Sequence, residues 1–246
     1  MVASLCCYGL VLGAAAQHYP AGAEGIKAAT LPPTGLYFRD YNFLYWADDF
    51  QNGPPRFDVF AYVNAPRLIW QTDRTICGAT YGMDIIVPFG YSNVRAVGMS
   101  DHVFGLGDIS LEPVLLSWHT ERFDFSAAYA LWVPSGNFDA KDLANMGKGF
   151  FTHMLTAGAT WYPDEQKSWS LSLLNRYEFN HEQEDTHVTP GQTLTMEWGV
   201  SKGVHKGVEI GAGHPVVRAF KRSFATLSGK TFSCCGNSLI GIQMGI

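Results

Sequence analysis

The sequence has few charged residues and no excess of positive charge. Charged side chains make up 16% of its 246 residues, whereas soluble domains usually carry about 25%. The formal net charge is −5 at pH 7, so the chain lacks the basic surface that nucleic-acid binding requires. We therefore expect no nucleic-acid partner.

The five cysteines suggest neither a disulfide framework nor a metal site. Cys6 and Cys7 fall near the N-terminus, and Cys234 and Cys235 are adjacent, a spacing that fits no zinc motif. Beyond the N-terminal residues there is also no uninterrupted apolar run of about 18 residues, the length that predicts a transmembrane helix. If this chain spans a membrane, it must do so as a β-barrel.

The first 16 residues have the pattern of a secretory signal peptide. An apolar run from Val2 to Leu12 is followed by the small residues Gly13 to Ala16, which predicts cleavage near residue 16. The usual positive charge before the apolar run is missing, so a plain apolar N-terminus is the alternative.

Aromatic residues and glycines are abundant, and the apolar residues alternate. In "SWSLSLLNRYEFN", residues 168–180, one parity holds Trp169, Leu171, Leu173, Tyr177 and Phe179. The other parity is mainly polar and includes Arg176 and Glu178. A period of two predicts a β-strand with one apolar and one polar side.

This alternation recurs in nine segments between Gly35 and Gly213. Each segment has roughly 8 to 13 residues, near the 9–11 that a tilted strand needs to cross a bilayer and longer than most soluble strands. Short turns alternate with long polar loops, as in outer-membrane barrels. The prediction is an all-β fold, a transmembrane antiparallel up-and-down β-barrel, and its strand number must be even.

The two parities indicate which side faces lipid. Aromatic residues gather near the ends of the apolar parity, where interfacial girdles are expected. The polar parity consists largely of small residues with sparse charges of both signs, which suits a barrel lumen. The candidate lumen-facing residues are Asp84, Asp108, Glu112, Asp124, Arg176, Glu178 and Glu197. They would act in selectivity or in packing of the lumen.

No catalytic, cofactor or metal site is expected. Ser117, His119 and Asp124 could be combined into a hydrolase triad, but no nucleophile-elbow sequence accompanies them. His181 and His187 are too far apart to share a helix face as zinc ligands. We therefore expect that the protein is not an enzyme.

Several segments resemble one known family. "HYPAGAEGI", "GLGD" and the hairpin "NRYEFN…TPGQ" are similar to the outer-membrane proteins of meta-pathway phenol degradation, over about Gln17 to Gly213. The resemblance implies a porin-like β-barrel of 10 to 12 strands in the outer membrane of a Gram-negative cell. It also implies transport of hydrophobic or aromatic molecules, and it supplies no catalytic residues.

The expected organisation has four parts. They are a signal peptide (1–16), an N-terminal extension (17–34), the barrel (35–213) and an atypical tail (214–246), whose composition suggests a frameshift and which holds a closing strand at 238–246. Expected partners are outer-membrane lipid, lipopolysaccharide, the barrel assembly machinery and small hydrophobic or aromatic solutes. The expected function is passive uptake of such solutes. A lipid-modifying outer-membrane enzyme, a plugged structural barrel and a soluble β-sandwich are the alternatives.

Overall fold

The computed structural model describes residues 17–48, 57–205, 208–220 and 239–244. The signal peptide expected at residues 1–16 lies outside this part of the chain. Apart from one short 3-10 helix, η1 (Gly25–Lys27), the regular elements described are β-strands. Within the described residues, no helix is long and apolar enough to cross a bilayer.

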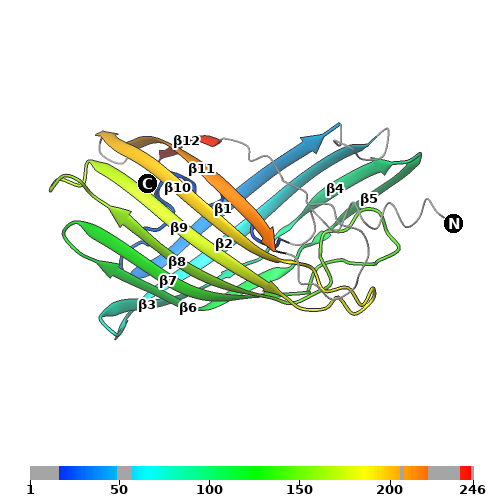
Figure 1. Ribbon diagram of the computed structural model, residues 1–246, viewed down its shortest axis with the longest axis horizontal. Helices are drawn as coiled ribbons and strands as arrows, with labels where there is room; N and C mark the ends of the chain where they lie inside the picture. Colours follow the sequence, from blue (N-terminus) through cyan, green and yellow to red (C-terminus); the bar gives the residue numbers. More distant parts are fainter. Residues whose placement is uncertain (1–16, 49–56, 206–207, 221–238, 245–246) are drawn as a thin grey trace.

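The strands form one antiparallel, curled sheet (Figure 1). Its buried side chains are largely polar. The strands are β1 (Gly35–Ala47), β2 (Asp58–Ile76), β3 (Ala79–Ile86), β4 (Phe89–Ala96), β5 (Met99–Leu106), β6 (Ile109–His119), β7 (Phe123–Val133), β8 (Thr152–Trp161), β9 (Trp169–Asn180), β10 (Gln192–His205), β11 (Val208–Phe220) and β12 (Leu239–Met244).

Two of the paths across the sheet are each made of two consecutive strands: β3 with β4, and β5 with β6. One part of β2 pairs with β3 and the other with β4, so β3 and β4 follow one path that is interrupted at Val87 and Pro88. In the same way β5 pairs with β4, and β6 with β3. The ladder continues across both interruptions, because Val87 N donates to Pro66 O (3.1 Å) and Gly107 N to Pro88 O (2.8 Å). Pro88 has no N–H to donate, which accounts for the local break.

In the part of the chain that the structure describes, twelve strands minus these two continuations give ten paths across the sheet. Ten is an even number, as single-chain outer-membrane barrels require, and it falls within the predicted range of 10 to 12. Among the described residues, β1 pairs with β2 and β12 pairs with β11, and no pairing joins β1 to β12. The described sheet is therefore a curled wall with two edges.

The C-terminal boundary differs from the sequence-based one. β11 continues to Phe220 in register with β10, beyond the expected end of the barrel at Gly213. The described pairing of β11 with β12 ends at Gly213, and Pro215 lies beyond that point, at an edge position that tolerates proline. β12 falls inside the segment where a closing strand is expected.

The outer face of the sheet is apolar and exposed. Alternate residues of β1 point outward, with Leu36 68% and Phe38 70% exposed. Large apolar side chains are exposed in the same way along β2, β8, β9 and β10. A small polar patch interrupts this face: Asn64 Nδ2 donates to Asp40 Oδ1 (2.8 Å), and Asn42 Nδ2 donates to Asp40 Oδ2 (3.0 Å).

Candidate functional site

Residues 17–34, which we call the inner segment, lie against the concave, polar side of the sheet. A side chain of β9 and one that immediately precedes β6 bind its first residues. Glu178 Oε1 accepts the N–H groups of His18 (2.9 Å) and Tyr19 (3.0 Å). Asp108 Oδ2 lies 2.9 Å from His18 Nε2, and this carboxylate also accepts the N–H groups of Gly136 (3.0 Å) and Lys148 (2.8 Å). Asp108 thus joins the inner segment to the loop after β7.

The middle of the inner segment lies close to the wall. Glu197 Oε1 accepts the N–H of Gly22 (2.8 Å), and Ser172 Oγ accepts that of Ala29 (3.0 Å). Gly199 makes the approach possible, because a Cβ at this position would lie 2.2 Å from the Ile26 carbonyl oxygen. The segment is therefore held by side chains of the wall and by close contact at a glycine.

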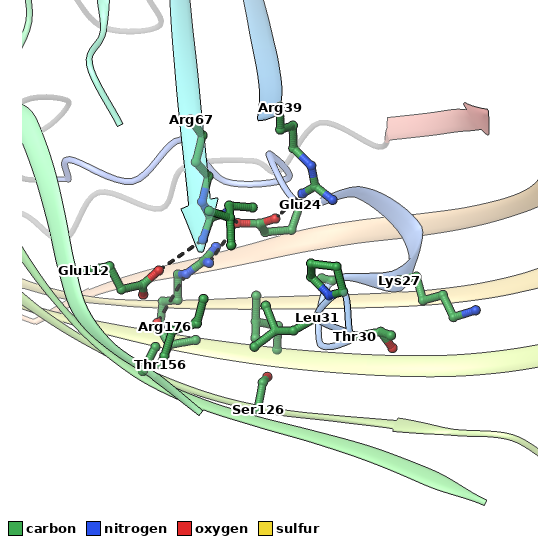
Figure 2. A pocket seen from close by; sticks show the side chains of 16 residues that line it. Glu24, Lys27, Thr30, Leu31, Arg39, Arg67, Glu112, Ser126, Thr156 and Arg176 are labelled. Atoms are coloured by element: carbon green, nitrogen blue, oxygen red, sulfur yellow. Dashed lines mark hydrogen bonds and ion pairs between the residues drawn. The ribbon is translucent and has the colours of Figure 1, made fainter. Parts of the chain in front are cut away.

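Glu24 is the centre of the site (Figure 2). Its Oε1 accepts hydrogen bonds from Arg67 Nη1 (2.7 Å) and Arg176 Nη2 (3.0 Å). Its Oε2 accepts one from Arg39 Nη1 (2.7 Å). Hydrogen bonds between ionised groups are about twice as strong as neutral ones, and this carboxylate is 9% exposed. One side chain of the inner segment thus joins β1, β2 and β9.

Arg67 extends this cluster into the wall. Its guanidinium also donates to Asp84 Oδ2 (2.5 Å from Nη2) and to Glu112 Oε2 (3.0 Å). Three arginines, Arg39, Arg67 and Arg176, therefore face three carboxylates, those of Glu24, Asp84 and Glu112. A buried charge is tolerated when it is paired and hydrogen-bonded, and this arrangement meets that condition.

A small cavity adjoins the cluster. It measures about 30 Å³, room for a few water molecules and not for an aromatic ring. Arg39, Arg67, Arg176 and Glu112 line one part of it, and Ile69, Leu115 and Leu174 line another, together with Leu31 of the inner segment. With the inner segment in place, the described lumen has no space at this level for an organic solute.

All seven predicted lumen residues are buried. The exposed fractions are Asp84 7%, Asp108 4%, Glu112 4%, Asp124 3%, Arg176 6%, Glu178 0% and Glu197 3%. Asp84, Glu112 and Arg176 meet in the arginine cluster. Glu178 and Glu197 bind the backbone of the inner segment, and Asp108 binds its His18 side chain. Asp124 lies apart, near the turn after β6.

Sequence reasoning missed three members of the cluster. Arg39 and Arg67 sit on the same parity as the inward-facing residues of their strands, so the alternation could have found them. Glu24 lies in a segment without alternation. Its one sequence signal is that it is the sole acidic residue between Gln17 and Thr34.

The described residues do not assemble the Ser117, His119 and Asp124 combination into a triad. His119 Nδ1 lies 3.0 Å from Asp124 Oδ1, but the second carboxylate oxygen binds the Tyr162 hydroxyl. Ser117 Oγ has no hydrogen-bond partner among the described residues, so the three side chains do not form a triad. No group of three or more His, Cys, Asp or Glu residues that could hold a metal occurs in the described part of the chain.

An antiparallel curled sheet with an apolar exterior and a polar interior defines the class of outer-membrane β-barrels. The chain belongs to the family described as "Putative MetA-pathway of phenol degradation", whose model matches residues 46–221. Its fold is similar to that of an outer membrane channel from Pseudomonas putida F1, known from a crystal structure, with a TM-score of 0.66 and 17% identity over 82% of this chain and 76% of that one. No curated protein matches the chain.

The exposed exterior and the family together place the protein in the outer membrane. The exposed residues of β1, β8 and β9 would face water in a soluble protein, at a cost of about 25 cal/mol per Å² of apolar surface. Lipid removes that cost. A soluble β-sandwich would instead bury this face between two sheets, and the described structure leaves it open.

Proposed function

We propose that the protein is an outer-membrane channel for passive uptake of small hydrophobic or aromatic compounds, linked to phenol degradation. The family description supports the link to phenol degradation, and the structural neighbour supports a channel. The polar concave face of the sheet, lined by charged side chains of both signs, supports a water-accessible path.

The observation that carries this proposal is how the inner segment is held. Side-chain hydrogen bonds and ion pairs attach it to the wall, whereas ladders of backbone hydrogen bonds hold the wall strands to one another. The segment can therefore leave the lumen without breaking the sheet. We infer that the channel is closed while the inner segment fills the lumen, and that withdrawal of residues 17–34 opens it.

A second candidate function is a structural barrel that stays plugged. The small cavity beside Glu24 and the dense bonding of the inner segment favour this alternative. A lateral route is a variant of the channel proposal, and the polar patch around Asp40 on the outer face would mark its position. The two candidates differ in one measurable property, which is whether the lumen conducts ions.

Single-channel conductance in planar bilayers tests the proposal. The full chain is compared with a variant that lacks residues 17–32, and folding of both is checked by heat-modifiable migration in gels. We expect rare openings from the full chain, steady conductance from the shortened one, and reduction of that conductance by a small aromatic solute. No conductance from either folded barrel would reject the channel and leave the plugged structural barrel.

A further inference from the structure

We infer that Arg39, Arg67 and Arg176 form a binding site for aromatic carboxylates, and that Glu24 occupies this site as a built-in competitor. The inference rests on the proposed function only in that a ligand must reach the lumen. It names the chemical class that the site recognises, a carboxylate attached to a flat apolar ring.

The charge balance of the cluster provides the first argument. With Glu24 in place, three guanidinium groups face three carboxylates. When Glu24 leaves, Arg39 and Arg176 lose the carboxylate that they pair with, while Arg67 keeps its ion pairs with Asp84 and Glu112. A buried uncompensated charge is costly, so the vacated site favours a monovalent anion.

The geometry of the bonds selects a carboxylate among anions. Arg67 and Arg176 donate to one oxygen of Glu24, and Arg39 donates to the other. The donors thus come from three strands and converge on the two oxygens of one carboxylate. Guanidinium groups match planar carboxylates especially well, and this arrangement is already formed by the wall.

The second half of the site is apolar. Leu31 of the inner segment packs against a buried group of Ile69, Leu115 and Ala128, and the same cavity is lined by these residues and by the three arginines. The inner segment therefore presents a carboxylate and an aliphatic side chain to adjoining parts of the wall. A benzoate-like molecule has the same two features.

The ligand and the inner segment exclude one another. The cavity of about 30 Å³ cannot admit a ring while Leu31 and Glu24 remain in place. Binding of an aromatic carboxylate therefore requires displacement of this part of the segment. A solute of this class would hold the lumen open, whereas a neutral aromatic molecule of the same size would lack the ionic contacts.

Titration calorimetry of the folded, detergent-solubilised full chain tests the inference. The probes are benzoate, benzyl alcohol and acetate, each at constant ionic strength, and the proteins are wild type, E24Q and E165Q. E165Q is the matched control, because Glu165 also pairs with an arginine, Arg122 at 3.2 Å, but lies on the surface. We expect E24Q to bind benzoate about tenfold or more tightly than wild type, since it lacks the internal competitor.

The remaining comparisons decide what is recognised. E165Q should bind benzoate like wild type, and benzyl alcohol and acetate should bind E24Q at least about tenfold more weakly than benzoate does. Equal benzoate affinity in wild type and E24Q, or equal affinity for benzoate and benzyl alcohol, would overturn the inference. If E24Q does not fold, G199V displaces the inner segment without altering an arginine and replaces it in the same titration.

Conductance of the same proteins separates this inference from the proposed channel. Benzoate binding by E24Q without any ion current would support the carboxylate site and reject the channel. Ion current through E24Q without benzoate binding would support the channel and reject the site.

Discussion

At the scale of single residues, Arg67 is the most connected side chain of the site. It is 3% exposed and binds Glu24, Asp84 and Glu112. Removing one partner of a buried ion pair lowers the stability more than replacing the whole pair by apolar residues, because the remaining charge stays buried without compensation. Asp84 and Glu112 would then be close like charges inside the wall.

The substitution R67Q should lower the free energy of unfolding by about 3–5 kcal/mol. The measurement is the urea midpoint of the protein folded in lipid vesicles. R74Q is the control, because Arg74 is 85% exposed on its side chain and lies 3.9 Å from Asp73, and such surface pairs contribute little. Equal midpoints for R67Q and R74Q would contradict a stabilising role of the buried cluster.

The sequence reveals some of these residues and not others. Arg176, Asp84 and Glu112 follow from alternation, since a charge on the polar parity of a transmembrane strand must point inward. Glu24 does not follow, because the inner segment has no period that tells which wall residues it meets. The contact between residues 152 positions apart, Arg176 and Glu24, exists only after the sheet has curled.

At the scale of elements, the inner segment depends on a glycine in a neighbouring strand. The Ile26 carbonyl oxygen occupies the space that a side chain of Gly199 would need, at 2.2 Å. That atom belongs to the backbone, so it cannot move aside like a flexible side chain. The wall and the segment therefore fit only while position 199 has no side chain.

The variant G199V should displace the inner segment and leave the strands in place, because valine suits β10. Trypsin cleavage after Lys27, which lies in this segment, should become about tenfold or more faster as the local opening free energy falls. Mass spectrometry of the released fragment measures the rate. G203V is the matched control on the same strand, since the nearest atom to its Cβ would be 3.7 Å away.

Strand prediction succeeded where one parity was apolar and failed where both were mixed. The nine alternating segments predicted from the sequence leave out residues 92–104, where the structure forms most of the hairpin of β4 and β5. Asn93 and Arg95 occupy the outward parity there, and the apolar residues Val94 and Val103 fall among the inward-facing ones. Pairing with β2, a property of the whole sheet, specifies these strands more than their own pattern does.

At the scale of the whole molecule, the separation of a lipid-facing exterior from a charged interior dominates. This separation was predictable, because a period of two assigns every residue of a long strand to one side. The filling of the interior was not, since nothing in the strand pattern indicates whether the lumen is empty. A plugged barrel, which is one of the alternatives that the sequence leaves open, and an open channel have the same wall. The strand pattern therefore does not distinguish them.

Depth in the membrane gives a test of the whole arrangement. Leu173 is 42% exposed near the middle of β9, and Val204 is 54% exposed near the end of β10. L173R should lower the free energy of unfolding by about 2–4 kcal/mol and V204R by about 0–1, since arginine is costly only near the bilayer centre. Urea unfolding in lipid vesicles measures both, and equal losses would contradict the assigned orientation.

The inner segment is continuous with β1, which begins at Gly35, so the competitor for the carboxylate site is tethered to the wall that it blocks. A tether this short maintains a local concentration on the order of millimolar, whatever the concentration of protein. A free carboxylate whose intrinsic affinity equals that of Glu24 must approach the same concentration before it occupies the site for half of the time. The channel would then stay closed at low solute concentrations and open increasingly as the solute concentration approaches that of the tethered competitor. This response to concentration needs no other regulator.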